Sequence, residues 1–232
     1  MSDILAIIPA RGGSKRVPKK NLKEIDGIPL VAHAINHAKN SAFINRIIVS
    51  TDDADISEIS IKYGAEIIDR PEGLRDDNTV MEADNILCDV VDKLEKKGED
   101  IKIVVLLYPT APLRTVEKID EAISLVDQQG YDSSLSLVHD QGYFWRAPND
   151  TNIIEPYNYT PSNRIPSVMH DFTQFKENKA IYVCTKKLLL DTRCRLGGKI
   201  GYVTMSSLES VDVDTLDDLA LCEILYNFNN KK

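Results

Sequence analysis

The chain has 232 residues, a hydrophobic fraction of 43%, a charged fraction of 28% and a formal net charge of −8. These values are ordinary for a globular protein, but the acidic excess argues against sequence-independent nucleic-acid binding and against binding to an anionic membrane, since both need a basic surface. The chain has no apolar stretch near the roughly 18 residues of a membrane span, and its start lacks the cationic region of a signal peptide, so we expect a cytoplasmic protein.

Predicted strands and helices alternate from residue 4 to residue 138. Strands are expected at residues 4–9, 46–50, 66–69, 103–107 and 133–138, and the runs at 4–9, 46–50 and 103–107 have the apolar character of buried strands. Helical patterns occupy residues 29–40, 55–63, 79–97 and 115–129. This alternation predicts an α/β fold with a doubly wound, mostly parallel, Rossmann-like sheet, in which ligands bind beyond the carboxyl ends of the strands.

Residues 139–179 interrupt this alternation and contain four of the ten prolines. Long irregular segments in compact domains are usually functional, so we interpret this one as a protruding lid, a dimerisation arm, or both, within a single domain spanning residues 1–232. Strands are expected again at 180–184 and 201–205. A last helix is expected near Thr215, where Thr215 and Asp218 resemble a capping box.

The loop after the first strand carries the strongest chemical signal. Gly12 and Gly13 allow the backbone to approach a ligand closely. Five cations lie within ten residues of this loop: Arg11, Lys15, Arg16, Lys19 and Lys20. Cations together with successive backbone N–H groups predict a cradle for a polyphosphate, although the loop matches neither the Walker A pattern nor the GxGxxG fingerprint.

A pair of aspartates near the end of the chain predicts a metal site. Asp212 and Asp214 are two residues apart in an extended segment and therefore face the same side. Two carboxylates beside a polyphosphate suit Mg²⁺, with Mn²⁺ as the alternative ion. A lone DxD pattern is weak by itself, and Asp214 could instead cap the last helix.

Three further loops also follow predicted strands. Residues 107–114 form a proline-stiffened turn closed by Arg114, Asp52 either caps a helix or contacts a ligand, and Arg70 is a candidate for binding phosphate or base. His33 and His37 have the spacing of zinc ligands on a helix, but the sequence offers no third ligand, so ordinary helix positions are favoured.

Six blocks together resemble the acylneuraminate cytidylyltransferases, or CMP-sialic acid synthetases. The blocks are IIPARGGSKRVPKKN, VSTDD, DRP, YPTAPLR, AIYV and SVDVDT, and they occur in the order of that family over nearly the whole chain. The resemblance implies a nucleotidyltransferase that transfers CMP from CTP to the anomeric hydroxyl of an acidic nine-carbon sugar and releases pyrophosphate. It also implies a homodimer in which an arm of one subunit reaches the other.

The resemblance assigns roles to individual residues. Arg11 and Lys20 would act in catalysis with Asp214, and Asp212 and Asp214 would hold the metal. The residues implied in substrate binding are Lys15, Asn21, Arg70, Thr79, Tyr108 and Arg164, the last beside the sugar carboxylate.

Departures from the family pattern concern the sugar. Tyr108 stands where sialic acid members usually have Gln, Arg16 where many have Gly, and Lys179 where NGAIY has Gly. A phenol offers one hydroxyl where Gln offers an amide, so the acceptor could be a relative such as legionaminic or pseudaminic acid. Two alternatives stay open: a CMP-Kdo synthetase or other sugar nucleotidyltransferase, and a non-catalytic nucleotide-binding protein.

Overall fold

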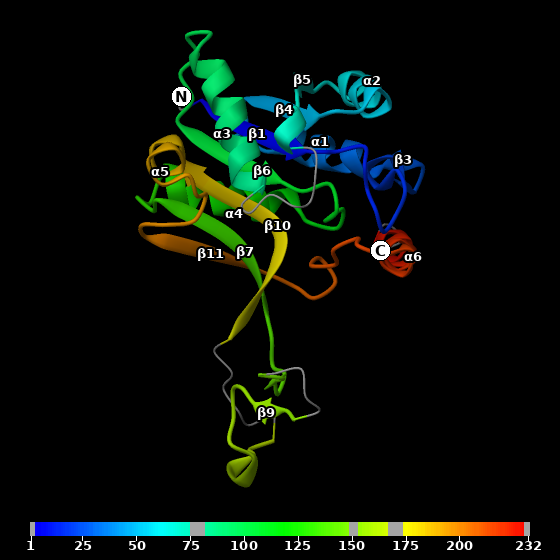
Figure 1. Cartoon of the computed structure of the whole chain (residues 1–232), viewed down its shortest axis with the longest axis vertical. Helices are drawn as coiled ribbons and strands as arrows, with labels where there is room; N and C mark the ends of the chain where they lie inside the picture. The colour runs from blue at the N-terminus through cyan, green and yellow to red at the C-terminus, as the bar shows by residue number, and fades with distance from the viewer. Residues whose placement is uncertain (1–2, 75–81, 149–152, 167–173, 230–232) are drawn as a thin grey trace.

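A computed structural model describes residues 3–74, 82–148, 153–166 and 174–229. Seven strands form one sheet in the order β11-β7-β10-β6-β1-β4-β5 (Figure 1). Their bounds are β1 Ile4–Pro9, β4 Arg46–Thr51, β5 Glu66–Asp69, β6 Ile103–Leu107, β7 Ser133–His139, β10 Phe175–Thr185 and β11 Ile200–Met205. Both pairings of β10 are antiparallel and the other four are parallel, which confirms a mostly parallel sheet.

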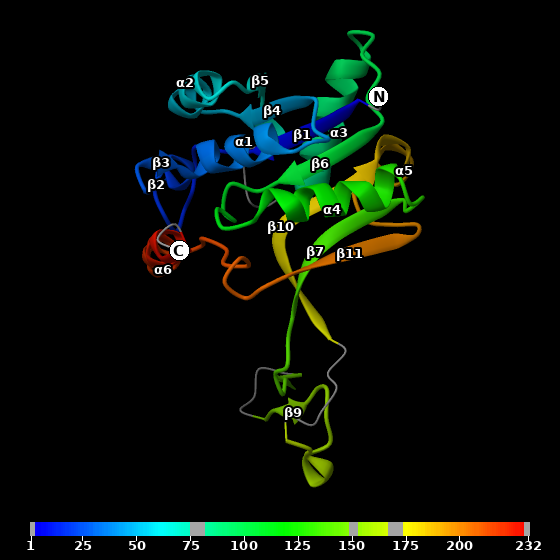
Figure 2. The same ribbon diagram turned by 180° about the vertical axis from the view of Figure 1, so that it is seen from behind.

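Helices cover both faces of this sheet (Figures 1 and 2). One apolar core includes residues of α1 (Leu30–Asn40), α2 (Ala54–Lys62) and α4 (Val116–Asp127). The other includes residues of α3 (Glu82–Glu95) and α5 (Lys186–Thr192). Strand β1 contributes to both, because alternate side chains of a strand point to opposite faces: Ile8 packs in the first core and Ile7 in the second. This two-sided burial explains its unbroken apolar sequence.

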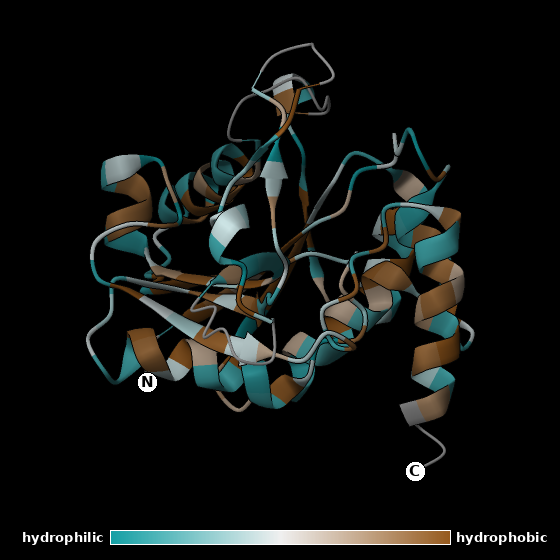
Figure 3. Ribbon diagram, turned by 90° about the horizontal axis from the view of Figure 1, so that it is seen from below, coloured by the Kyte–Doolittle hydropathy of each residue, from teal (hydrophilic) through white to brown (hydrophobic). Residues whose placement is uncertain are grey.

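Helix α6 (Leu216–Asn229) lies at one end of the sheet and packs on the hairpin of β2 (Glu24–Ile25) and β3 (Ile28–Pro29). The Asp218 carboxylate accepts hydrogen bonds from the Thr215 N–H at 2.7 Å and from its hydroxyl at 2.8 Å, and the Asp218 N–H bonds back to that hydroxyl, so the expected capping box forms. Figure 3 shows hydrophobic residues, in brown, along much of α6.

The described residues between β7 and β10 (140–148 and 153–166) project from the body as an arm (Figures 1 and 2). It contains β8 (Trp145–Arg146), β9 (Glu155–Pro156) and the 3₁₀ turn η3 (Pro161–Asn163). Tyr159 is in edge contact with the rings of Tyr143 and Trp145, so aromatic side chains within the arm pack on one another.

Some elements differ from the sequence expectation. Strand β10 begins at Phe175, five residues before the expected start, so the irregular excursion ends earlier. Helix α5 was not expected, and the 3₁₀ turns η1 (Lys20–Leu22) and η2 (Glu72–Leu74) are too short to leave a periodic pattern. None of the helices in the described ranges is both long and apolar enough to cross a bilayer.

Candidate active site

A cavity of about 610 Å³ opens at the carboxyl ends of the parallel strands, where the doubly wound fold predicts it. Loops that follow β1, β5 and β6 contribute to its wall, as do β10 and the segment before α6. Its charged lining residues are six cations and three carboxylates: Arg11, Lys15, Arg16, Lys20, Arg70, Lys179, Glu82, Asp212 and Asp214. The cavity therefore has a net positive lining in a protein of net charge −8, which suits an anionic ligand.

The glycine- and lysine-rich loop is held against the body by its own polar groups. The Gly12 N–H donates to Oδ1 of Asp52 at 3.0 Å, and Nδ2 of the buried Asn21 donates to the Arg11 carbonyl at 2.9 Å. The cap of α2 is Asp53, whose Oδ1 accepts from the Ile56 N–H at 3.0 Å. Asp52 therefore neither caps this helix nor lines the cavity; it anchors the loop.

Lys20 joins the basic loop to the acidic segment 193 residues further along the chain. Its Nζ donates to the Val213 carbonyl at 2.9 Å and to Oδ1 of Asp214 at 3.1 Å. The Val213 N–H in turn donates to the Thr110 carbonyl at 2.8 Å, which ties the same segment to the loop after β6. The predicted meeting of the cationic loop with the two aspartates is thus present in the structure.

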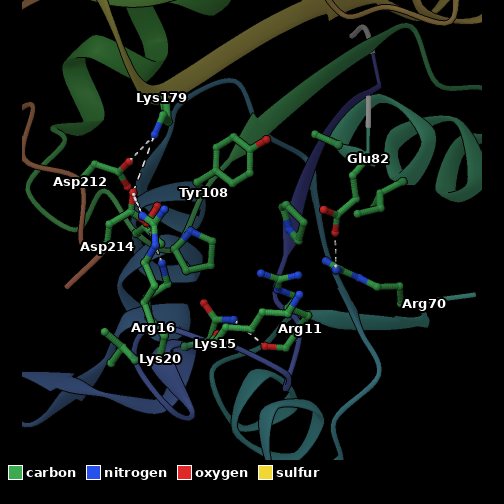
Figure 4. A pocket seen from close by; sticks show the side chains of 18 residues that line it. Arg11, Lys15, Arg16, Lys20, Arg70, Glu82, Tyr108, Lys179, Asp212 and Asp214 are labelled. Atoms are coloured by element: carbon green, nitrogen blue, oxygen red, sulfur yellow. Dashed lines mark hydrogen bonds and ion pairs between the residues drawn. The ribbon is translucent and has the colours of Figure 1, made fainter. Parts of the chain in front are cut away.

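Asp212 and Asp214 both face the cavity (Figure 4). Nζ of Lys179 lies 3.0 Å from Oδ2 of Asp212 and 4.0 Å from Oδ2 of Asp214. Nη1 of Arg16 lies 3.5 Å from Oδ2 of Asp214. The hydrogen bond to Asp212 raises the pKa of the Lys179 ammonium above its ordinary value, so this group stays charged at neutral pH.

This arrangement fits a divalent cation. One ammonium nitrogen lies within 4.0 Å of a carboxylate oxygen of each aspartate, so both carboxylates approach the same part of the cavity. Two carboxylates completed by phosphate oxygens and water are the donor set that Mg²⁺ accepts in nucleotide sites. Among the described residues, three or more His, Cys, Asp or Glu side chains do not gather anywhere into a metal-binding group.

The opposite wall carries an ion pair whose cation is buried (Figure 4). Nη1 of Arg70, a side chain that is 2% exposed, lies 3.1 Å from Oε1 of Glu82 at the start of α3. Burial lowers the pKa of Arg70, and the charge of Glu82 opposes that shift. Arg70 therefore lines the cavity as expected, with its charge partly balanced by Glu82.

Tyr108 lies between these walls, directly after β6 (Figure 4). Burial raises the pKa of its phenol, which therefore stays protonated and can donate a hydrogen bond. Its ring meets Tyr182 edge-on, and Tyr182 lies under the guanidinium of Arg195 at 4.4 Å. The fully buried Arg114 donates to the carbonyls of Tyr108 and Ala180, so it shapes the turn from behind and does not line the cavity.

The structure brings together most of the residues singled out from the sequence. Those lining the cavity are Arg11, Lys15, Lys20, Asn21, Arg70, Tyr108, Asp212 and Asp214. Arg164 does not line it: in its own chain this residue lies in the arm, with its guanidinium 4.3 Å from the Tyr143 ring. Thr79 lies outside the described residues.

Two cavity residues were not assigned a role from the sequence. Lys179 was noted only as a departure from a family block, and its approach to the aspartates depends on an irregularity of β10 that has no local signature. Glu82 lies in the first turn of α3, where acidic residues are common because they stabilise the start of a helix. Its sequence position therefore does not indicate a role in the cavity.

The two histidines of α1 lie on the side of the helix that packs against the body. His33 is buried and its Nε2 is 3.0 Å from the Ile25 carbonyl, while its ring centroid is 6.4 Å from that of His37. Both rings take part in packing, as expected of ordinary helix positions.

Comparisons with known proteins agree with this geometry. The sequence profile of the family described as Cytidylyltransferase matches residues 5–215. The CMP-N,N'-diacetyllegionaminic acid synthase of Legionella pneumophila is 30% identical over 234 residues, covering 98% of each chain. The pseudaminic acid cytidylyltransferase of Campylobacter jejuni is 29% identical over 234 residues, covering 98% of this chain and 97% of the relative.

Solved structures share the fold at lower identity. A CMP:2-keto-3-deoxy-manno-octonic acid synthetase complexed with CTP has a TM-score of 0.70 at 17% identity and covers 98% of this chain and 100% of its own. A 4-diphosphocytidyl-2C-methyl-D-erythritol synthase has a TM-score of 0.70 at 11% identity and covers 97% and 99%. The profile match over most of the chain, together with full-length relatives, shows that this chain belongs to the cytidylyltransferase family of nucleotidyltransferases.

Proposed function

We propose that this protein transfers CMP from CTP to the anomeric hydroxyl of a nine-carbon α-keto acid sugar in the cytoplasm, with Mg²⁺ bound at Asp212 and Asp214. The observation that carries the proposal is the position of Lys20, which joins the cationic loop to the carboxylate of Asp214 on one cavity wall. A triphosphate in this cavity would meet cations from the loop and a metal at the aspartates.

The reaction needs positioning and charge neutralisation more than a covalent catalyst. The acceptor oxygen forms a bond to the α-phosphorus, the bond from that phosphorus to the bridging oxygen breaks, and pyrophosphate leaves with that oxygen while the hydroxyl proton is released. Arg11, Lys15 and Lys20 would stabilise the negative charge that develops on the phosphate oxygens. Mg²⁺, when bound, adds positive charge beside the same oxygens.

The acceptor is proposed to be a legionaminic- or pseudaminic-type acid. Two full-length relatives are named for such acids. Tyr108 supports this choice because it lines the cavity as a partly buried, protonated phenol, which offers one hydroxyl to a sugar where Gln offers an amide.

The active protein is proposed to be a homodimer joined through the arm. Ile154 and Tyr157 of the arm are 56% and 68% exposed, and exposed apolar side chains that gather on a projecting segment mark contact surfaces. Arg164 lies on the same arm, so in a dimer it could approach the cavity of the partner subunit.

The test is pyrophosphate release from each nucleoside triphosphate with Mg²⁺ and a panel of sialic, legionaminic, pseudaminic and Kdo acceptors. We expect release with CTP and an N-acylated nine-carbon acid, and much less with Kdo. Asp214→Asn should remain folded and lose about 100-fold or more in rate, since a metal ligand is removed. The matched control is Asp217→Asn at an exposed position in the first turn of α6, which should keep the wild-type rate.

The outcomes separate the alternatives. A preference for Kdo would reassign the acceptor, and a preference for another triphosphate would reassign the donor. Binding of CTP without turnover on any acceptor would identify a non-catalytic nucleotide-binding protein. A wild-type rate for Asp214→Asn would remove that aspartate from the site.

A further inference from the structure

Lys179 lies beside both of the aspartates that would hold a metal ion. Its Nζ is 3.0 Å from Oδ2 of Asp212 and 4.0 Å from Oδ2 of Asp214, and Figure 4 shows its side chain reaching across to both. The Lys179 side chain is 56% exposed, whereas those of Asp214 and Asp212 are 39% and 20% exposed, so Lys179 lies on the solvent side of Asp212.

The backbone holds Lys179 at this position. The pairing of β10 with β7 shifts register between Glu177 and Tyr182, and within this irregularity Lys179 has φ of 57°, in the left-handed region that favours glycine. The preceding residue, Asn178, is buried: its Oδ1 accepts from the Ser136 hydroxyl at 2.6 Å, and its Nδ2 donates to the Ser210 hydroxyl at 2.9 Å. Asn178 thereby fixes the irregular turn of β10 to the segment that carries the two aspartates.

The charges around this pair are already more than balanced. Lys20 and Arg16 approach Asp214 at 3.1 and 3.5 Å, and Lys179 contacts both carboxylates, so three cations face two anions. A divalent cation entering this cluster would be repelled by the cations at short range. A nucleoside triphosphate brings several negative charges, which reverses the balance and draws the cations toward the phosphates.

We infer that Lys179 is a resident counter-ion that keeps Asp212 and Asp214 closed to a divalent cation until a nucleoside triphosphate occupies the cavity. This inference rests on the proposed function, because it takes the two aspartates as the metal ligands. It makes metal binding and nucleotide binding strongly coupled, and such coupling is reciprocal between the two ligands.

The test measures Mn²⁺ binding to the purified protein by the loss of the free-ion EPR signal, without nucleotide and with an uncleavable α,β-methylene analogue of CTP. Without nucleotide, Lys179→Gly should bind Mn²⁺ about tenfold or more tightly than wild type, because one cation has been removed beside the ligands. With the analogue, the two proteins should agree within about threefold, since the triphosphate already offsets the ammonium.

Arg193→Gly is the matched control. Arg193 also has positive φ, 55°, and is also cationic, but it ends α5 and does not line the cavity, so this variant should bind Mn²⁺ as wild type does. Lys179→Arg keeps the positive charge and should bind Mn²⁺ without nucleotide as weakly as wild type does. Adding Asp212→Asn to Lys179→Gly should abolish the tighter Mn²⁺ binding, which would show that the added Mn²⁺ affinity depends on the Asp212 carboxylate. If Lys179→Gly misfolds, Lys179→Asn replaces it, because Asn also tolerates this backbone conformation.

An unchanged Mn²⁺ affinity of Lys179→Gly without nucleotide would overturn the inference, as would an equal gain with and without the analogue. A weaker affinity for the CTP analogue with unchanged Mn²⁺ binding would show instead that Lys179 is a phosphate ligand. If Lys179→Gly binds Mn²⁺ more tightly but the wild-type protein forms no CMP-sugar, this inference stands and the proposed function fails. If the wild-type protein forms a CMP-sugar but Lys179→Gly binds Mn²⁺ as wild type does, the proposed function stands and this inference fails.

Discussion

Gly12 and Gly13 are adjacent in the cationic loop, but a side chain meets very different surroundings at the two positions. A Cβ added at Gly12 would lie 2.4 Å from Oδ2 and 2.9 Å from Cβ of Asp53, the residue that caps α2. A Cβ added at Gly13 meets no atom within 4 Å. Only the first glycine is therefore required by the packing of the protein itself.

We expect Gly12→Ala to reduce the free energy of unfolding by about 1–3 kcal/mol, because the loop or the α2 cap must shift to relieve the overlap. Gly13→Ala is the control and should change the free energy of unfolding by less than about 0.5 kcal/mol. Urea unfolding of the two variants and the wild type measures both values. Equal stabilities for Gly12→Ala and wild type would show that the loop adapts without cost.

Most of the charged cavity residues could be predicted from their sequence positions. Arg11 and Lys20 belong to a dense cationic loop after a buried strand, and the spacing of Asp212 and Asp214 places two carboxylates on one side. Lys179 could not be assigned in this way, because its location depends on a register shift between two strands and on long-range hydrogen bonds of Asn178.

At the scale of elements, α1 carries a histidine whose protonation the fold opposes. Nδ1 of His37 is buried and has no hydrogen-bond partner among the described residues. Burial, with smaller contributions from the charges of Arg114 and His33, lowers the pKa of His37 to about 3. Above pH 6.5 this group is neutral in both folded and unfolded chains. Below that pH the unfolded chain gains a proton that the folded chain does not bind, so stability falls as the pH falls toward 3.

We expect His37 to account for a loss of about 2–3 kcal/mol in the free energy of unfolding between pH 7 and pH 4.5. Urea unfolding over this range should show a shallower decline for His37→Gln than for wild type. The exposed His139, changed to Gln, is the control and should keep the wild-type slope. Identical slopes for wild type and His37→Gln would mean that the ring is protonated in the folded protein.

The central strands β1, β4 and β6 could be predicted because parallel strands buried on both faces are largely apolar. The direction of β10 could not: its apolar residues are the same for a parallel and an antiparallel strand, and its orientation follows from the path of the chain through the arm. Helix α5 was missed because it has seven residues and only Leu189 is buried, too little for a periodic pattern.

At the scale of the whole molecule, the arm extends away from the body and exposes apolar side chains (Figure 1). Such a segment contributes little to the core of its own chain, so burial against a second copy would explain its composition. In that assembly the arm would form the contact between the subunits, and its Arg164 could approach the cavity of the partner subunit.

We therefore expect Ile154→Asp combined with Tyr157→Asp to convert a dimer to a monomer in sedimentation velocity and to lower kcat by about tenfold or more, since charges replace buried apolar contacts at the interface. The melting temperature of the body should change little. Asn163→Asp adds a charge at an exposed polar position of the same arm and should remain dimeric. A wild-type chain that is monomeric at every concentration tested would contradict the dimer proposal.

The order of apolar strands, the glycine- and cation-rich loop and the paired aspartates are local properties, so the amino-acid order alone was enough to indicate an α/β fold and a phosphate-binding chemistry. Other features came only from the folded chain: the contact between Lys20 and Asp214 across 194 positions, the placement of Lys179 beside the aspartates, and the separation of Arg164 from the cavity of its own chain. The physical reason is that such contacts depend on strand order, strand register and the course of the arm, which arise from packing between distant segments and leave no pattern in neighbouring residues.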